Sequence, residues 1–408
     1  MQTLSTTPGA GGTVKSIPED FIVKEIIANG KTLELDTNYS AQALGQEEPA
    51  DAKFTTFVLQ KKNWNTIQAV TTIAKKLAHG KGSIGYSGVK DRASVSVQLA
   101  SIFGSTPEQV LAQNVKDVKI NGAWKSNGVE MGSNIGNAFD VVIRNPTNKE
   151  HAEKTIEELN GRMPNYFDRQ RFGSRLNNAR IGYLILKQDF NAALTAFLTD
   201  TENEDNQNAI EARKKLLGDG NYKEALSGFP RYLAAERMAI NYMAEYDNPA
   251  NAIRKIPKGI QLLFIHALEA FIYNSAVAQR IRERDFSSNV YLKQNFFGFP
   301  SDERSSEPGF ACELLPGYET KKEDISDYAK EVMERIDITP EEFKIKSMPE
   351  LSMRGVARSI LAPVKDFRCN AEEDIKLSFS IPSGSYATIL LNEITKSNDN
   401  YMDLVKVN

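Results

Sequence analysis

One carboxylate stands between two cations in a glycine-rich turn, the Gly-Val-Lys-Asp-Arg stretch at 88–92. The turn lies between a short apolar segment and an alternating strand pattern at 95–99, so we expect the Asp91 side chain to be exposed. Neighbouring cations stabilise the ionised form of a carboxyl group. An ionised carboxylate can act as a nucleophile or a base, and we therefore predict that Asp91 is catalytic. The alternative is that Asp91 caps a turn or a helix.

A second segment interleaves aromatic rings, guanidinium groups and amides, in the order Pro164-Asn165-Tyr166-Phe167-Asp168-Arg169-Gln170-Arg171-Phe172-Gly173-Ser174-Arg175. Side chains of these kinds can stack on a nucleobase, read its edge and hold phosphates. We favour functional roles for Asn165, Phe167 and Arg171. Tyr166 and Phe172 are explained at least as well as core residues. The alternative for the whole segment is a helix-to-loop junction whose aromatic residues fill the core.

Residues that bind metals are few and scattered. The chain has three histidines (His79, His151 and His266) and two cysteines (Cys312 and Cys369), none at metal-ligand spacing. This argues against a metal centre and against a Cys–His nucleophile. We expect no cofactor. The two cysteines also favour a reducing intracellular compartment.

The charge of the chain is nearly balanced overall but not locally. The formal net charge is -3 over 408 residues, so no global positive field attracts nucleic acid. Residues 61–92 nevertheless carry seven basic residues against one acid, and residues 161–180 carry five arginines against one acid. Two such basic segments with glycines and aromatic residues favour a phosphate-facing surface. The alternative is that these charges lie on ordinary solvated faces.

The ends and the apolar content of the chain predict a soluble, cytoplasmic protein. Residues 1–12 are rich in Ser, Thr and Gly and lack an apolar segment, so we expect a mobile tail. No uninterrupted run of 18 apolar residues occurs. We expect no association with a membrane.

Hydrophobic periodicity indicates the elements that must position these residues. Residues 14–26 indicate a turn followed by a strand, and alternating or apolar runs predict strands at 54–60, 95–99, 139–143, 376–381 and 388–391. Asn65 is placed to cap a helix, another helix is expected at about 149–159, and residues 30–52 are expected to form a loop or insertion. Residues 192–284 are almost entirely helical by period, with breaks at 218–221 and 248–249.

These elements predict an α+β protein in which a mainly helical segment interrupts the catalytic domain. We assign residues 1–185 and 350–408 to the catalytic domain and residues 186–349 to the insertion. Length alone is consistent with two or three domains.

Together, the motifs of this chain resemble those of the TruD family of tRNA pseudouridine synthases. The family pattern of Gly-x-Lys-Asp, with glutamine seven residues after the aspartate, matches Gly88, Lys90, Asp91 and Gln98. The Pro-Asn-Tyr-Phe and Gln-Arg-Phe-Gly elements match residues 164–167 and 170–173. Pro-Glu-Asp-Phe matches residues 18–21, with Lys15 three residues before the proline. A late Pro-x-Gly-Ser-aromatic-Ala-Thr element matches residues 382–388.

The resemblance implies a fold, a reaction and a set of residues. The fold is a pseudouridine-synthase-like domain with a central, mainly antiparallel sheet flanked by helices, plus a helical insertion. The reaction is cofactor-independent isomerisation of uridine in tRNA, typically at position 13, with Asp91 as nucleophile or base and Lys15 as the cation that orients it. The substrate-binding residues it implies are Phe21, Lys90, Arg92, Gln98, Asn165, Phe167, Arg171 and Tyr386.

Within that set, Phe21 and Phe167 are expected to stack on a base and Tyr386 to pack against the detached uracil. Asn165 is expected to bond near the base or Asp91. Lys90 and Arg92 are expected to serve the loop or RNA phosphates.

Alternatives to this assignment are the same chemistry on another RNA and a non-catalytic RNA-binding or chaperone protein of the same fold. We expect a monomer. Asp168 departs from the family pattern, which has glycine there, and either weakens phosphate contact or pairs with Arg169.

Overall fold

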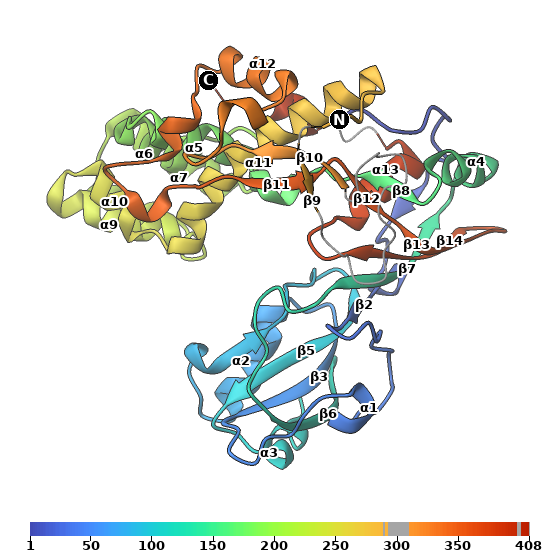
Figure 1. Cartoon of the computed structure of the whole chain (residues 1–408). Helices are drawn as coiled ribbons and strands as arrows, with labels where there is room; N and C mark the ends of the chain where they lie inside the picture. The colour runs from blue at the N-terminus through green and yellow to red at the C-terminus, as the bar shows by residue number, and fades with distance from the viewer. Residues whose placement is uncertain (289, 293–309, 398–400, 408) are drawn as a thin grey trace.

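The structure is a computed structural model that describes residues 1–288, 290–292, 310–397 and 401–407 (Figure 1). Within these residues the main sheet has nine strands. Their order is β13 (Lys365–Ala371), β14 (Ile375–Pro382), β7 (Gly136–Arg144), β2 (Phe21–Ile26), β5 (Val95–Phe103), β3 (Phe54–Lys62) and β6 (Val118–Ser126), with β1 (Thr13–Val14) on β7 and β4 (Ile84–Tyr86) on β5. Every pair is antiparallel except β2 with β5. The predicted mainly antiparallel sheet is confirmed.

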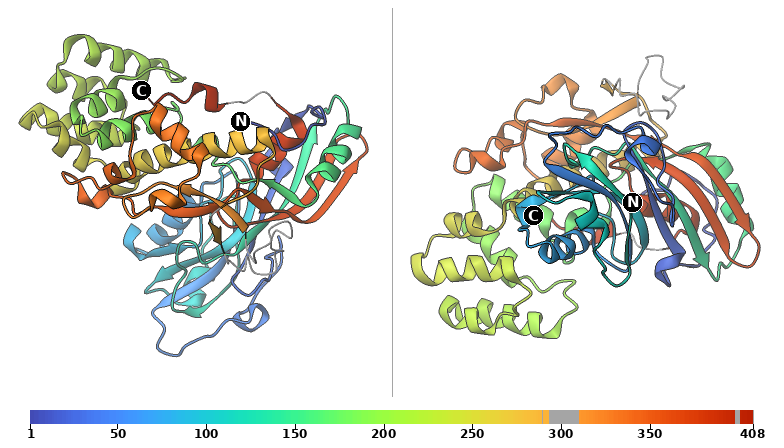
Figure 2. Two further views of the ribbon diagram at one scale, coloured as in Figure 1. Left: turned by 45° about the horizontal axis from the view of Figure 1, so that its top comes forward. Right: turned by 90° about the horizontal axis from the view of Figure 1, so that it is seen from below.

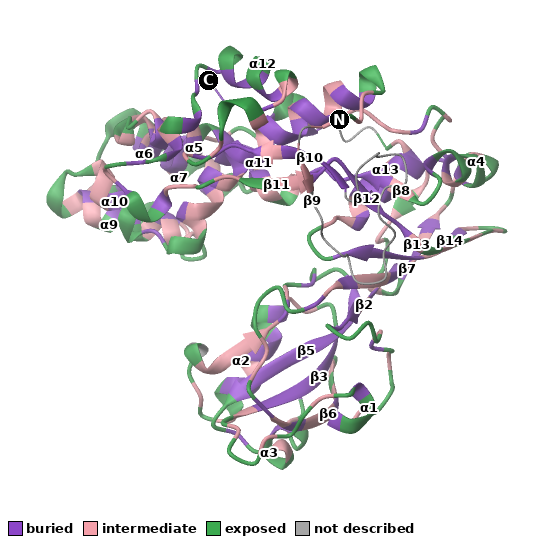
Figure 3. Cartoon of the chain, in the orientation of Figure 1, coloured by how far each residue is buried: buried purple, intermediate pink, exposed green. Residues whose placement is uncertain are grey.

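The β3–β5–β6 part of the sheet forms a lobe with a small core on each of its two faces (Figures 1 and 3). Phe57 and Leu59 face α2 (Thr66–Lys76), whereas Val58 faces the other way, as the two-residue period of a strand requires. Helix α2 begins where predicted, because the Asn65 side chain accepts a hydrogen bond from the Ile67 amide at 2.9 Å.

The 30–52 segment, expected to be a loop, contributes to the second of these cores. Leu33 and the short helix α1 (Ala41–Leu44) are buried there beside Trp124. A polar segment without clear periodicity thus holds three separate apolar anchors. Helix α3 (Pro107–Leu111) completes this lobe.

One strand prediction is wrong. Residues 388–391 belong to helix α13 (Ala387–Thr395), not to a strand. Its buried residues Ala387, Leu390, Leu391 and Ile394 follow a helical period, and the helix packs against α4 (Glu150–Leu159) and β8 (Arg162–Pro164). A short apolar run has no periodicity that separates a strand from a buried helix, so packing decided between them.

The segment predicted to be helical is helical. Residues 192–284 hold most of α6 (Phe190–Thr199) and all of α7 (Gln207–Asp219), α8 (Tyr222–Gly228), α9 (Ala234–Tyr246), α10 (Pro249–Lys255) and α11 (Lys258–Glu283), and α5 (Asn178–Leu186) precedes them. The predicted breaks hold, because Gly220 ends α7 with a left-handed φ of 62° and Asn248 caps α10. Figures 1 and 2 show α6–α10 gathered at one end of the molecule, with β13 and β14 at the other.

Helix α11 is a core helix in the part of the molecule that lies at the top of Figure 1. It is the one helix among the described residues that is long and apolar enough to cross a membrane, and 67% of its most apolar window is buried inside the protein. It packs against α5, α12 (Asp327–Arg335) and β10 (Phe310–Leu315). Burial of this kind marks a core helix of a folded protein.

The helical part and the catalytic part share one hydrophobic core. This core includes Phe139 and Phe379 from the main sheet together with Phe264 and Leu268 from α11. In addition, β10 pairs with β11 (Val356–Ser359), across the expected boundary at residue 350, and with β9 (Tyr291–Leu292). A second small sheet joins β12 (Leu361–Pro363) to β8. The domain boundaries stay a prediction, and packing continues across them.

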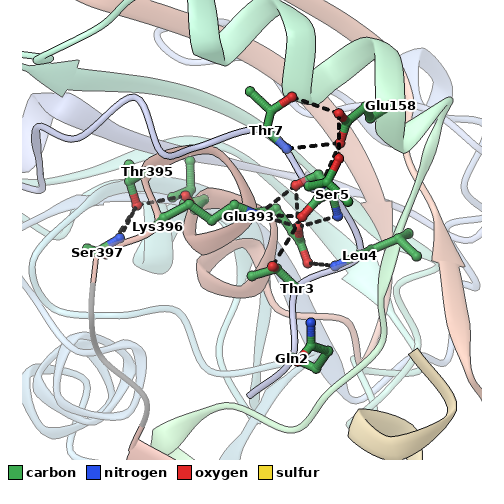
Figure 4. Close-up of polar contacts among 12 residues, drawn as sticks. Gln2, Thr3, Leu4, Ser5, Thr7, Glu158, Glu393, Thr395, Lys396 and Ser397 are labelled. Atoms are coloured by element: carbon green, nitrogen blue, oxygen red, sulfur yellow. Dashed lines mark hydrogen bonds and ion pairs between the residues drawn. The ribbon is translucent and has the colours of Figure 1, made fainter. Parts of the chain in front are cut away.

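The N-terminal segment is docked, contrary to the expected mobile tail (Figure 4). The buried carboxylate of Glu393 accepts hydrogen bonds from the Leu4 amide at 2.7 Å and from the Ser5 amide and hydroxyl at 3.1 and 2.8 Å. Glu158 accepts bonds from the amides and hydroxyls of Thr6 and Thr7. The small polar residues of this segment therefore act as donors to two helix carboxylates, which sequence composition alone does not show.

Candidate active site

A cavity of about 720 Å³ opens where the catalytic sheet, the 87–91 loop and the turn before α13 meet. Phe21, Lys90, Asp91, Arg171 and Tyr386 line it, all of them predicted site residues. The other predicted residues, Lys15, Arg92, Gln98, Asn165 and Phe167, do not line it. The structure thus brings predicted residues from four distant parts of the sequence to one cavity.

Asp91 and Lys15 form an ion pair at the edge of this cavity. The Lys15 ammonium lies 2.7 Å from Asp91 Oδ2, and the Asp91 side chain remains 47% exposed. Lys15 follows β1 in the left-handed region, at φ 61°, which is uncommon for a residue other than glycine. Its ammonium also lies 4.2 Å from the centre of the Phe21 ring. The pair therefore presents an accessible carboxylate next to a fixed cation.

The buried side chain of Lys61 is hydrogen-bonded to the backbone of Asp91. Lys61 Nζ donates to the Asp91 carbonyl at 2.9 Å, and Ser94 Oγ donates to the same oxygen at 2.8 Å. Lys61 is fully buried in β3. Removal of its ammonium from water lowers the pKa of Lys61 to about 8, against a smaller opposing effect of the Asp91 charge. Sequence reasoning noted Lys61 only as part of a basic segment.

Gln98 supports the catalytic loop from inside the sheet. Its amide is fully buried, donating to the Gly88 carbonyl at 2.8 Å and accepting from Thr66 Oγ1 at 2.8 Å. Thr66 Oγ1 in turn accepts from the Lys90 amide at 2.9 Å. The prediction that Gln98 binds substrate is therefore corrected: its polar atoms are used to fix the loop.

The ammonium of Lys90, the residue before Asp91 in the sequence, is bonded to groups other than the Asp91 carboxylate. Lys90 is 7% exposed, and its ammonium contacts Asn137 Oδ1 at 2.7 Å and Glu25 Oε2 at 3.3 Å. These contacts agree with the first of the two expected roles of Lys90, which is to support the loop, and a contact of Lys90 with an RNA phosphate stays a prediction. Arg92 is exposed and lies outside the cavity lining, so its phosphate contact stays a prediction.

Asn165 is bonded to its neighbours and does not reach the cavity. Arg358 donates to the Asn165 carbonyl at 2.9 Å and to Asn165 Oδ1 at 2.7 Å, and Ser385 Oγ donates to the same Oδ1 at 3.0 Å. Asn165 Nδ2 donates to Ser359. The expected contact with a base is therefore replaced by a structural one: Asn165 ties the 164–167 segment to the turn that lines the cavity.

Phe167 does not line the cavity, and its ring contacts two guanidinium groups. The guanidinium carbon of Arg358 lies 4.2 Å, and that of Arg171 5.0 Å, from the centre of its ring. The ring is 7% exposed and meets Tyr386 edge-on at 6.4 Å. Phe167 is buried and does not line the cavity, so Tyr386, which lines it, is better placed than Phe167 to contact a base. Phe21 lines the cavity as well but is 3% exposed.

Several lining residues were missed by sequence reasoning. They include Ser87, Asn134, Asn137, Leu263 and Ser385. Asn137 lies just before the strand predicted at 139–143, and Leu263 lies on α11, whose pattern indicates only a core helix. Asp168 is the residue that departs from the family pattern. It accepts from the Arg169 amide at 2.7 Å and from Thr388 Oγ1 at 2.8 Å, so it joins the 164–173 segment to the start of α13, next to the turn that lines the cavity.

Within the described residues, no three His, Cys, Asp or Glu side chains gather in a geometry that could hold a metal ion. The cavity instead offers the exposed Asp91 carboxylate with the Lys15 cation at its edge, the Asp168 carboxylate, an aromatic wall and several amides and hydroxyls. This is an arrangement for binding a polar ring and attacking beside it.

Comparison with solved structures gives the class of protein. The chain superimposes on the crystal structure of a Methanosarcina mazei protein designated TruD with a TM-score of 0.72 at 28% sequence identity, covering 97% of this chain and 96% of that one. The α+β fold with its helical insertion is thus the fold of a pseudouridine synthase.

Comparison of sequences identifies the family. The family model described as tRNA pseudouridine synthase D (TruD) matches residues 1–394, and the chain belongs to this family of isomerases. It is 30% identical to "Probable tRNA pseudouridine synthase D" of Thermococcus sibiricus, over 96% of this chain and 97% of the relative. The protein of the same name from Methanopyrus kandleri is 31% identical over 86% of this chain and 87% of its own length.

Proposed function

We propose that this chain converts uridine to pseudouridine in tRNA without a cofactor, with Asp91 as the nucleophile or base. The observation that carries the proposal is the accessible Asp91 carboxylate at the cavity, paired with Lys15 at 2.7 Å. Family membership supports the reaction class, and by the same resemblance we propose uridine 13 as the target.

The reaction breaks the bond between uracil N1 and ribose C1′, turns the base and joins C5 to C1′, after which the C5 proton leaves to solvent. An ionised carboxylate can attack C1′ or remove the C2′ proton to form a glycal, and in either route its charge stabilises positive charge developing at C1′. Lys15, paired with Asp91 at 2.7 Å, holds the carboxylate in position for this step. No group beyond these side chains and the RNA is needed for the atoms to balance.

The cavity has the dimensions that a flipped nucleotide requires. Sites for small ligands occupy roughly 300–1,000 Å³, and this one measures about 720 Å³. A base inside an RNA stack is flipped out at a cost of a few kcal/mol, and contact with an aromatic ring recovers part of it. Tyr386 and Phe21 supply aromatic surface in the cavity lining.

Release of tritium from tRNA labelled at uridine C5 tests the proposal. Wild type is expected to release the label, whereas Asp91→Asn, which keeps the shape of the side chain but not its charge, is expected to release none. The mutant should bind tRNA within a few-fold of wild type. Turnover by Asp91→Asn at the wild-type rate would refute the role of Asp91.

Two further outcomes address the alternatives. Binding without release by wild type would favour a non-catalytic RNA-binding protein. Mass-spectrometric mapping of the product gives the target: pseudouridine at position 13 is expected, and modification only elsewhere or only in another RNA would contradict the proposed substrate.

A further inference from the structure

Among the described residues, only the oxygen end of the Asn137 side-chain amide is hydrogen-bonded. Asn137 lies in β7 and lines the cavity. Lys90 Nζ lies 2.7 Å from its side-chain oxygen, and an ammonium group can only donate, so the oxygen must face Lys90. The Nδ2 group is then directed away from Lys90. Among the residues that the structure describes, it has no hydrogen-bond partner.

Asn134 provides a contrast within the same cavity. Its Nδ2 donates to the Gly136 carbonyl at 3.1 Å, and its Oδ1 accepts from Ser383 Oγ at 3.2 Å. Both ends of that amide are therefore used by the fold. Of these two cavity asparagines, only Asn137 has an Nδ2 group that makes no hydrogen bond to a residue that the structure describes.

A buried network holds Asn137 in this orientation. Glu25 is fully buried and contacts Lys90 at 3.3 Å, accepts from the Leu99 amide at 3.1 Å and is bonded to Ser87 Oγ. Lys90 is thus fixed between Glu25 and Asn137, and the amide that faces it is fixed as well. A donor whose direction is set before binding discriminates well between ligands that differ in one acceptor.

We propose that Asn137 is a specificity-determining residue whose Nδ2 donates a hydrogen bond to a carbonyl oxygen of the target uracil. The inference rests on the proposed function, because it takes the Asp91 cavity as the uridine site. Uracil must make a half-turn about the line through N3 and C6, which exchanges N1 with C5 and O2 with O4. A carbonyl oxygen therefore meets the same donor before and after the turn. Cytosine, which carries an amine at C4, would place a donor against this donor in one of the two orientations.

Replacing oxygen with sulfur in the RNA tests the contact, because sulfur is a weak acceptor. Turnover is measured on tRNA with uridine, 2-thiouridine or 4-thiouridine at the target position. We expect wild type to lose about 10-fold or more in kcat/KM on at least one thio substrate. Equal rates on all three substrates would overturn the proposal.

Asn137→Asp keeps an oxygen for Lys90 but replaces the donor with an acceptor. We expect this variant to be about 10- to 100-fold slower on uridine and to show no further loss on the thio substrate. Asn137→Ala should show the same insensitivity to sulfur, and a thermal melt of each variant confirms folding. If Asn137→Asp keeps the wild-type rate or the wild-type sulfur penalty, Asn137 serves only to hold Lys90 and the proposal is wrong.

Asn134→Ala is the matched control, since it removes an amide from the same cavity whose two ends are already bonded. It should keep the sulfur penalty of wild type, and loss of the penalty there would also overturn the proposal. Asp91→Asn is assayed alongside. Absence of turnover by wild type would refute the proposed function, and turnover by Asp91→Asn at the wild-type rate would refute the role of Asp91. Wild-type behaviour of the Asn137 variants alone refutes only the present inference.

Discussion

The Lys15 ammonium lies 2.7 Å from Asp91 Oδ2, although 76 positions separate the two residues in the chain. The Lys15 ammonium lies 4.2 Å from the centre of the Phe21 ring, and the backbone of Lys15 is left-handed, with a φ of 61°. Residues in sparsely populated backbone regions persist when the surrounding structure fixes them, and they concentrate at functional sites. The docked N-terminal segment that leads to Lys15 is therefore part of the active-site architecture.

Lys15→Met should lower kcat by about 100-fold or more, because a carboxylate displaced by about 1 Å loses productive geometry. The dissociation constant for tRNA should change by less than about threefold, since an exposed ion pair contributes little binding energy. Lys15→Arg keeps the charge and should retain more activity than Lys15→Met. Single-turnover rates and equilibrium binding separate the two effects. A loss of affinity as large as the loss of rate would instead make Lys15 an RNA-binding residue.

Glu393→Ala should destabilise the protein by about 2–4 kcal/mol, because it leaves donors of the N-terminal segment without a buried acceptor. Denaturant unfolding measures this change. Limited proteolysis should then cut within residues 1–12, and kcat should fall because Lys15 follows this segment. Glu158→Ala is the control: Glu158 binds Thr6 and Thr7 from an exposed position, so a smaller effect is expected. Equal effects of the two changes would contradict the importance of the buried anchor.

Lys61 should produce a decline of kcat/KM above about pH 8. Burial lowers the pKa of Lys61 to about 8, so its ammonium, which donates to the Asp91 carbonyl, becomes neutral above that pH. Lys61→Arg keeps the charge and should move the decline to higher pH. Lys62→Arg, at the exposed neighbouring position, should leave the profile unchanged. A wild-type profile that stays flat to pH 9.5 would contradict the assignment.

The same pKa shift predicts how stability depends on pH. The unfolded chain keeps the Lys61 proton up to the ordinary pKa of 10.5, and the folded chain only up to about 8. Between these values the unfolded state binds more protons, so the contribution of Lys61 to the free energy of unfolding rises with pH. Relative to Lys61→Met, wild type should therefore gain stability between pH 7.5 and 9.5 in denaturant unfolding. An unchanged difference would rule out a lowered pKa.

Arg358→Lys should lower both stability and activity. The arginine bonds to Asn165 through two of its nitrogens, reaches the Gly384 carbonyl at 2.9 Å and covers the Phe167 ring. A lysine cannot reproduce this planar set of donors. We expect a loss of about 2–4 kcal/mol in denaturant unfolding and a lower kcat, because the cavity turn at 383–388 loses its anchor. Wild-type stability would show that the turn is held by other contacts.

The sequence by itself determined the fold class, most of the strands and helices, and the motif that contains Asp91. These features depend on local patterns: alternation in β2 and β5, the Asn65 cap, and Gly220 and Asn248 at helix ends. Signals of this kind come from residues that lie close together in the chain. The same signals failed at 388–391, where a short apolar run fits either a strand or a buried helix.

Tertiary structure decided which side chains face the cavity. Lys90 and Arg92 flank Asp91 in the chain, but the Lys90 ammonium is bonded to Asn137, and Lys15, just after β1, supplies the cation that pairs with Asp91. Asn165 is hydrogen-bonded to Arg358, whereas Asn137 lines the cavity and its Nδ2 group has no partner among the described residues. The direction of a side chain depends on partners distant in the sequence, and for this reason only the folded structure could assign these roles.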